Sequence, residues 1–314
     1  MALPKQYLTF PSPYKRVPRL NRLVHTLAGL LLFPVYWGAA YLVGTPGLAF
    51  RSLCASMALR LLKNKGDHVK AYGLLVAPLD SVRYFEFDFM WRAVKNIQIN
   101  SYLDVSSPRM LPLMIARQRK TLNVDLINPD KKDLPETIAL ARSFGVERRC
   151  RFHDSLIEDA PLEAGTFDLI TSMSVIEHIP DDTGAIKAMW SLLKPGGVLL
   201  ISVPCAAKAW EEYSNLNDYE LMGTDESGFV FWQRYYDELQ LQERIYSVTG
   251  KPRSCRIFAE RTAGSYDRNV TRKRTDPYYP YWKEPFMMGV EYGYASEISQ
   301  LPGMGVIAME FAKP

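Results

Sequence analysis

The feature that most constrains the fold is a regular alternation of strand-length apolar runs and helical patterns between residues 97 and 205. Strands are predicted at residues 97–105, 121–127, 150–153, 167–173 and 198–203, and helices at residues 110–119, 131–144 and 181–193. Such an alternation is typical of a parallel sheet with helices on both faces. Ligands of these sheets bind beyond the carboxyl ends of the strands, so the residues that follow each strand are the first candidates for a site.

Beyond residue 205 the alternation is less regular. A helix is predicted at residues 236–247, and strands at 256–260 and 306–312 would complete the sheet. We expect residues 206–235 and 261–303 to be cap or lid insertions, since connections this long are usually functional or disordered. The chain is therefore divided into an N-terminal extension, residues 1–95, and an α/β domain, residues 96–314.

Four short motifs occur in order along the predicted strands. They are Tyr102-Leu-Asp-Val-Ser-Ser-Pro-Arg-Met110, Asn123-Val-Asp-Leu126, Val175-Ile-Glu-His178 and Leu193-Lys-Pro-Gly-Gly197. In this combination residues 97–205 resemble the class I S-adenosylmethionine-dependent methyltransferases, particularly their small-molecule group. The resemblance implies a Rossmann-like, mostly parallel sheet of seven strands, a helical N-terminal extension and S-adenosylmethionine as cofactor.

The resemblance also implies which residues contact the cofactor. Asp104 would hold the end of the first loop and interact with the methionine part, Asp125 would bind both ribose hydroxyls, and Asp154 would accept a hydrogen bond from the adenine amine. The full set of expected cofactor-binding residues is Asp104, Ser106, Ser107, Asp125, Leu126, Asp154, Ser155, Leu156, Ser172 and Met173. Asp168, at the start of a predicted strand, is expected to be structural instead.

The first motif departs from the family, because Ser106, Ser107 and Pro108 replace its loop glycines. Glycine suits such a loop since backbone must approach the ligand closely and can need a positive φ. Serine is small enough to keep the approach and adds a hydroxyl, whereas Pro108 cannot donate a backbone N–H. The alternative is a non-methylating descendant of the fold, either a binding or scaffold module or a cofactor-free enzyme.

Candidate catalytic and acceptor-binding residues are harder to assign. His178 could act as a general base because histidine titrates near neutral pH, but a structural histidine is the stronger interpretation. Trp232, Arg234, Tyr235 and Tyr236 are candidates for an acceptor wall, and packing of a cap against the sheet explains them equally well. The aromatic stripe of the helix predicted at residues 81–95 is more typical of a core.

The N-terminal extension carries an uncharged stretch, residues 23–50, that is longer than the ~18 apolar residues that indicate a membrane span. Pro34 and Gly44 interrupt it, which suggests a bent, re-entrant element, and a buried cap helix is the equal alternative. Residues 51–65 form a basic amphipathic helix of the kind that lies on a membrane surface or covers a core. Residues 1–70 carry a net charge of +9 and the rest of the chain −5, a distribution that suits an anionic membrane better than DNA.

Together these patterns predict methyl transfer from S-adenosylmethionine to an oxygen, less favourably a nitrogen or carbon, of a hydrophobic or membrane-derived small molecule. RNA methylation is the weaker alternative and rests on the basic, aromatic residues of the second insertion. The four cysteines and four histidines lack metal-ligand spacing, so no metal is expected. Reduced cysteines suit the cytoplasm, in this case at the cytoplasmic face of a membrane.

Overall fold

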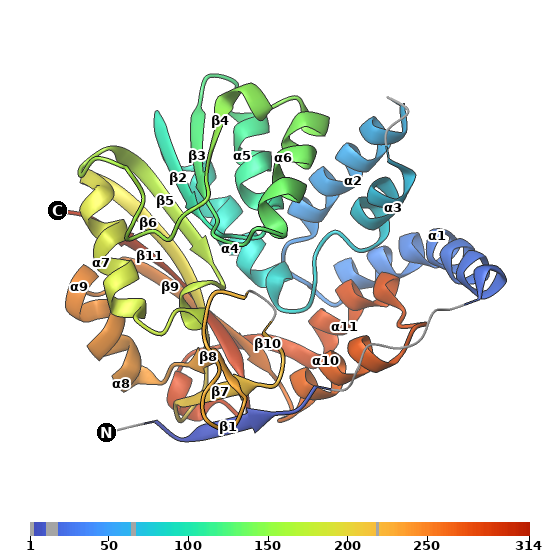
Figure 1. Ribbon diagram of the computed structural model, residues 1–314. Helices are drawn as coiled ribbons and strands as arrows, with labels where there is room; N and C mark the ends of the chain where they lie inside the picture. The colour runs from blue at the N-terminus through green and yellow to red at the C-terminus, as the bar shows by residue number, and fades with distance from the viewer. Residues whose placement is uncertain (1–2, 11–17, 64–66, 218–219) are drawn as a thin grey trace.

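The computed structural model of the protein describes residues 3–10, 18–63, 67–217 and 220–314. A large twisted sheet forms the centre of the molecule, with helices on both of its faces (Figure 1). A second, smaller sheet lies at the bottom of this view, near the N-terminus. The predicted α/β class is therefore confirmed.

The large sheet has eight strands in the order β10-β9-β11-β6-β5-β2-β3-β4. Strands β6, β5, β2, β3 and β4 are parallel to one another, and β11 pairs antiparallel with both β6 and β9. The strands are β2 (Ser101–Val105), β3 (Asn123–Ile127), β4 (Cys150–His153), β5 (Phe167–Met173), β6 (Leu193–Cys205), β9 (Ser254–Glu260), β10 (Tyr292–Ala295) and β11 (Gly305–Ala312).

The strand count differs from the seven that the resemblance implied. The additional strand, β10, pairs antiparallel with β9 at the edge of the sheet and lies inside the predicted insertion 261–303. Its sequence, Tyr292-Gly-Tyr-Ala295, is too short to stand out as a strand, and a pairing partner that lies over 30 residues away stabilises it.

Helices cover the two faces of the large sheet separately. One face is covered by α4 (Arg83–Lys95), α5 (Met110–Gln118) and α6 (Asp133–Phe144). The other face is covered by α7 (Asp182–Leu192) and by the continuous segment α8 (Glu238–Gln240), η3 (Leu241–Tyr246) and α9 (Ser247–Thr249). Local signals set several ends: Gly145 ends α6 with a left-handed φ of 69°, and the Asp181 carboxylate caps α7 through the Gly184 N–H.

The two predicted insertions contain regular structure. Residues 206–235 include β7 (Trp210–Ser214) and β8 (Val230–Tyr235), which form the small sheet with β1 (Lys5–Leu8). Residues 261–303 include α10 (Ser265–Thr275), the 3-10 helix η4 (Tyr281–Lys283), α11 (Glu284–Glu291) and β10.

The N-terminal extension forms α1 (Arg19–Leu42), α2 (Leu48–Lys63), α3 (His68–Val76) and α4. Helix α1 continues through Pro34, and the turn comes later, at residues 43–47. Gly47 is required there, because its φ is 75° and a Cβ would lie 2.1 Å from the carbonyl oxygen of Tyr84. The bend that Pro34 suggested is thus absent from α1, and Gly44 and Gly47 make the turn.

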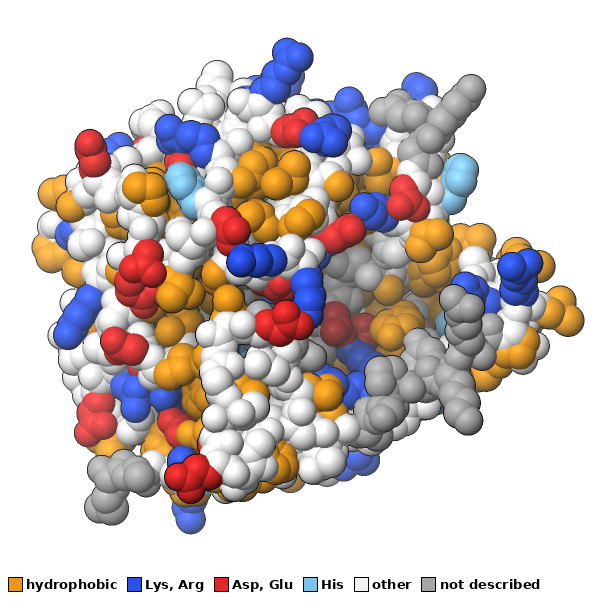
Figure 2. Space-filling view, in the orientation of Figure 1, with side chains coloured by type: hydrophobic (Ala, Val, Ile, Leu, Met, Phe, Trp, Pro, Cys, Tyr) orange, Lys and Arg blue, Asp and Glu red, His pale blue; other side chains and the backbone are white. Residues whose placement is uncertain are grey.

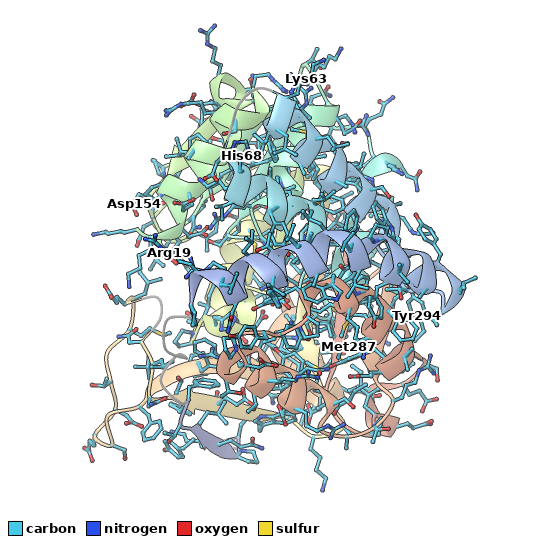
Figure 3. All side chains as sticks on the ribbon, turned by 90° about the vertical axis from the view of Figure 1, so that its right-hand side faces the viewer. Arg19, Lys63, His68, Asp154, Met287 and Tyr294 are labelled. Carbon is cyan, nitrogen blue, oxygen red and sulfur yellow. The ribbon has the colours of Figure 1, made fainter. Side chains whose placement is uncertain are left out.

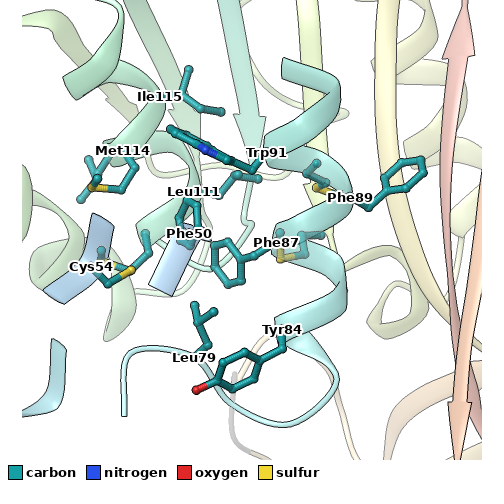
Figure 4. Close-up of a cluster of buried hydrophobic side chains, with 14 of the residues drawn as sticks. Phe50, Cys54, Leu79, Tyr84, Phe87, Phe89, Trp91, Leu111, Met114 and Ile115 are labelled. Atoms are coloured by element: carbon teal, nitrogen blue, oxygen red, sulfur yellow. The ribbon is translucent and has the colours of Figure 1, made fainter. Parts of the chain in front are cut away.

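The extension is fastened to the sheet by a large aromatic cluster between α2, α4 and α5 (Figure 4). The rings of Phe50 and Phe87 stack with centroids 4.4 Å apart, and Trp91 meets Phe50 edge-on at 5.1 Å. All three side chains are buried. The aromatic stripe of α4 is therefore a core feature, as its spacing predicted, and it fixes α4 over the sheet.

Candidate cofactor and acceptor site

Asp104 is the second-last residue of β2, and its carboxylate is almost completely buried. Its Oδ1 accepts the backbone N–H of Ser107 at 3.1 Å, and its Oδ2 accepts the Thr171 hydroxyl at 2.5 Å. Burial raises the pKa of Asp104 to about 6, although these hydrogen bonds oppose the rise. Asp104 therefore holds the first turn of the loop against β5.

Ser106 occupies the position of the first expected glycine and has the backbone conformation that glycine would provide. Its φ is 53°, and its N–H donates to the carbonyl oxygen of Ile127 at 2.9 Å. A left-handed conformation costs a non-glycine residue roughly 1–2 kcal/mol. The Ser107 hydroxyl accepts the N–H of Met173 at 3.0 Å, so the two serines keep the loop close to the carboxyl ends of β3 and β5.

Asp125 lies in the middle of β3, two residues before the strand ends. Its carboxylate is buried and engaged on both sides, by Arg151 Nη2 at 2.6 Å and by His153 Nε2 at 2.8 Å. Both partners come from β4, the neighbouring strand. The strand continues two residues further, because the Asn128 N–H still pairs with the carbonyl of His153. The ribose role of Asp125 stays a prediction, and Leu126 is buried in the core on the other face of the strand.

The residues at the true end of β3 form a polar cluster that the motifs did not reveal. Asn128 Nδ2 donates to Asp133 Oδ2 at 2.8 Å, and Arg109 forms an ion pair with the other oxygen of Asp133. Arg109 follows the serine loop, so this cluster joins the ends of β2 and β3. The Asn128-Pro129-Asp130 turn, between the predicted strand 121–127 and the predicted helix 131–144, was the available signal.

Asp154, Ser155 and Leu156 follow β4, as the resemblance required. Asp154 is exposed, Leu156 is 47% exposed, and the Ser155 hydroxyl is buried without a hydrogen-bond partner among the described residues. The hydroxyl of Ser172, in β5, is likewise buried and unpartnered, whereas Met173 packs into the core. Two of the expected cofactor-binding side chains thus have unused hydrogen-bonding capacity.

Glu86 is a site residue that the sequence did not point to. It comes from α4, is fully buried, and reaches the carboxyl ends of β5 and β6. Its Oε1 accepts hydrogen bonds from Ser174 at 2.5 Å and from Ser202 at 2.6 Å, while its Oε2 has no partner among the described residues. It was hidden because it stands inside the aromatic stripe of a helix that the sequence analysis assigned to the core.

Glu177 lies beside this group. It is 2% exposed, and its Oε2 also lacks a partner within the described part of the chain. Burial, together with the charge of Glu86, raises the pKa of Glu177 to about 8, and Arg83 partly offsets the rise. Nη1 of Arg83 is a third buried atom for which the described residues offer no partner. We refer to Arg83, Glu86, Ser174 and Glu177 as the polar niche.

The surroundings of His178 do not favour a general base. Its Nδ1 lies 2.5 Å from the carbonyl oxygen of Trp232, so in the neutral ring Nδ1 carries the proton. Burial lowers the pKa of His178 to about 4. A histidine with this pKa is a weak base at neutral pH, so the geometry favours the structural interpretation over catalysis.

The predicted acceptor wall is part of an internal ion network. The Arg234 guanidinium is buried between Asp182 at 2.6 Å and Glu211 at 2.9 Å, and the Tyr236 hydroxyl donates to Asp182 at 2.6 Å. Tyr235 stacks on Trp210 with ring centroids 4.0 Å apart. Trp232 is half-buried and meets His178 edge-on. Packing between β8 and α7 thus accounts for Arg234 and Tyr236, and their acceptor role stays a prediction.

Within the described residues, no three His, Cys, Asp or Glu side chains converge as a metal site. The four cysteines are all unpaired. The space-filling view shows the surface hollowed near its centre, between the part of the molecule with α5 and α6 and the part with α10 (Figure 2).

The buried Asp104 near the end of β2, the left-handed Ser106 that follows it and the parallel strand order are the structural features that the resemblance implied. Residues 99–243 match the family described as a methyltransferase domain. This match bears out the methyltransferase resemblance for residues 99–243, a little under half of the chain.

Among curated proteins, the chain is similar to the ubiquinone biosynthesis O-methyltransferase of Xanthomonas axonopodis pv. citri (strain 306), with 42% identity over 71 residues. The match covers 22% of this chain and 30% of that relative, so the chain spans less than a third of the length of the curated relatives it matches.

Two solved structures illustrate the similarity in fold. A putative sarcosine dimethylglycine methyltransferase from Galdieria sulphuraria is 14% identical with a TM-score of 0.47, over 74% of this chain and 86% of the other. A geranyl diphosphate methyltransferase in complex with S-adenosylmethionine is 11% identical with a TM-score of 0.43, over 68% and 78%. At these identities the similarity describes the fold alone.

Proposed function

We propose that the protein transfers a methyl group from S-adenosylmethionine to an oxygen of a hydrophobic small molecule. The observation that carries this proposal is the polar niche at the carboxyl ends of the central strands. There, buried carboxylate oxygens of Glu86 and Glu177 lack partners among the residues that the structure describes. Unpartnered buried polar atoms are costly, so they are typical of groups that a ligand completes. Nitrogen and carbon acceptors are less favoured alternatives.

The residues present fit the cofactor. Ser106 keeps the left-handed backbone that the family obtains from glycine, so the Ser-Ser-Pro sequence does not by itself block a ligand. The unpartnered hydroxyls of Ser155 and Ser172 and the engaged carboxylate of Asp104 are the groups that would hold it. When bound, S-adenosylmethionine supplies a methyl group made electrophilic by its positively charged sulfur.

The polar niche supports an oxygen acceptor. A pKa of about 8 keeps Glu177 largely protonated at neutral pH, so its carboxyl group can donate a hydrogen bond to the acceptor. The free Oε2 of Glu86 can accept the acceptor's O–H and take its proton as the new C–O bond forms and the sulfur–methyl bond breaks. Ser174 and Ser202 hold Glu86 in place for this role.

A first prediction concerns Asp104. We expect Asp104→Asn to weaken S-adenosylmethionine binding by about tenfold or more, because an amide cannot accept all the hydrogen bonds that fix the serine loop, and the loss of one such bond to a charged group costs ~1.5–3 kcal/mol. Calorimetric titration with S-adenosylmethionine measures the change.

Asp168→Asn is the matched control, since Asp168 holds Asn100 and Ser101 at the opposite end of the sheet, and its affinity should stay within about twofold of wild type. If the wild-type protein released no heat with S-adenosylmethionine, the non-methylating alternative would replace the proposal.

We also propose that α1 docks the protein on the cytoplasmic face of a membrane, which would bring it to a hydrophobic acceptor. Among the described residues, α1 is the one helix long and apolar enough to cross a membrane, and only 11% of its apolar window is buried. Its outer face exposes a row of large apolar side chains: Leu20, Leu23, Val24, Leu27, Leu31, Val35 and Leu42.

The inner face of α1 favours a helix that lies in the plane of the membrane over one that spans it. Gly29 packs against Tyr72 and Trp282, the His25 ring lies 4.7 Å from that of Trp282, and Tyr36 meets Phe286. Figure 3 shows α1 crossing this side of the molecule, with α2 and α3 above it and α11 below. A helix packed on protein along one side presents only its other side to lipid.

The prediction for α1 is that Leu27→Ser combined with Leu31→Ser lowers vesicle binding at least about tenfold, since each buried leucine contributes roughly 1.5–3 kcal/mol. Co-sedimentation with phosphatidylcholine vesicles measures binding. Leu221→Ser with Leu239→Ser removes two other exposed leucines, 48% and 60% exposed, and should leave binding unchanged. Equal binding by both variants would argue that α1 covers protein only.

A further inference from the structure

A groove between α2 and α5 combines positive charge with an apolar wall. It has a volume of about 430 Å³, and Leu53, Met57 and Met114 form its apolar part. Arg60 and Lys63 of α2 and Arg117 of α5 also line it, with no acidic residue among its lining side chains. The basic side chains thus converge from two helices on one space.

These three cations are not balanced within the protein. In the described ranges, none of them lies within 4.0 Å of a carboxylate, in contrast to neighbouring Lys70, which pairs with Glu136 at 3.0 Å. Partial burial and then the charges of Arg60 and Arg149 lower the pKa of Arg117. An anion bound in the groove would relieve the repulsion between these cations.

We infer that this groove binds the phosphate head group of an anionic lipid, with Arg60, Lys63 and Arg117 as its ligands. Guanidinium groups bind phosphate oxygens in pairs, and basic clusters beside amphipathic helices are typical of anionic-lipid recognition. A soluble phosphate ion would need only the positive charges of the groove for binding. The wall of Leu53, Met57 and Met114, and the exposed Leu59 and Leu62 on the same helix, suit a ligand that also carries an acyl chain.

The position of the groove agrees with the proposed docking of α1 on a membrane, and this inference rests on that proposal. Helix α2 follows α1 after a short turn and ends at Lys63, which stands above α1 on the side that Figure 3 presents. Apolar contact through α1 would then hold the protein at the surface, while the groove selects the head group.

Vesicle co-sedimentation with two lipid compositions tests the inference. Wild-type protein should bind vesicles of phosphatidylcholine with phosphatidylglycerol about tenfold more tightly than phosphatidylcholine alone. Arg60→Gln with Arg117→Gln should lose this preference and keep the binding to phosphatidylcholine. Arg142→Gln with Arg253→Gln, which removes two exposed cations paired with Glu147 and Glu310, should keep the preference.

Three results would overturn the inference. The first is that the Arg60 and Arg117 variant retains the preference for phosphatidylglycerol, and the second is that both charge variants lose this preference equally. The third is that inorganic phosphate binds the wild-type protein in a titration and abolishes vesicle binding, which would indicate a soluble ligand. Binding of the Leu27→Ser, Leu31→Ser variant to phosphatidylcholine vesicles tests the membrane docking of α1 independently of the groove. Methyl transfer measured in detergent tests the enzyme separately from both.

Discussion

Replacement of Glu86 by glutamine is expected to lower the rate of methyl transfer by about 100-fold or more, with the affinity for S-adenosylmethionine within about twofold of wild type. Glutamine keeps a carbonyl oxygen for Ser174 and Ser202, so the fold around α4 should be preserved. It cannot accept a proton, and its NH₂ group takes the place of the free Oε2. The variant therefore removes the proposed base without removing the packing.

The measurement is the incorporation of labelled methyl from S-adenosylmethionine into a hydrophobic extract of the source cells, with calorimetry for the cofactor. Asp88→Asn is a matched control on the same helix, since Asp88 is also largely buried but pairs with Arg92 at 2.8 Å. A Glu86→Gln protein as active as this control would show that Glu86 only fastens α4 to the sheet.

A stability measurement separates these roles further. A buried carboxylate oxygen without a partner is destabilising, so Glu86→Gln should unfold at an equal or higher temperature than wild type. A residue needed only to fasten α4 would instead lower the unfolding temperature when changed. Loss of activity together with retained stability is thus the result expected of a group reserved for the acceptor.

The sequence predicted the parts of this fold that depend on local pattern. Strands at residues 150–153 and 167–173 appear with the predicted bounds, and α6 and α7 begin within two residues of the predicted starts, because apolar periodicity and turn residues act over a few positions. Strand β10 and the small sheet were missed, because their pairing partners are distant in the chain.

The site was predictable only where the motifs lie. The motifs placed Asp104 at the end of β2 and Ser106 directly after it, because residues at strand ends keep their place in this fold. Glu86 reaches the same region from outside the motifs, across a gap of 88 residues to Ser174, and only tertiary packing brings it there. Asp125 shows the opposite case, in which the motif was found but its carboxylate lies inside the strand, two residues before the strand ends.

The second large effect concerns the ion network of α7 and β8. We expect Asp182→Ala to lower the free energy of unfolding by about 3–5 kcal/mol, the usual cost of removing one partner from a buried ion pair. Asp182 is fully buried and accepts hydrogen bonds from Arg234, Arg244 and Tyr236. Its loss would leave the Arg234 guanidinium buried with Glu211 as its remaining carboxylate partner. Urea unfolding followed by circular dichroism measures the change.

The neighbouring residue provides the control. Asp181→Ala removes a carboxylate from the same turn, but this side chain only caps α7 through Gly184, so the expected loss is about 1 kcal/mol. The double variant Asp182→Leu with Arg234→Met should recover part of the loss, because it removes the Arg234 guanidinium together with the Asp182 carboxylate. The double variant also tests one residue of the predicted acceptor wall: if Arg234 bound the acceptor instead of supporting α7, the stable double variant would still fail to transfer methyl groups. Activity in that variant would therefore assign Arg234 to the structure and would favour the polar niche as the place of the acceptor.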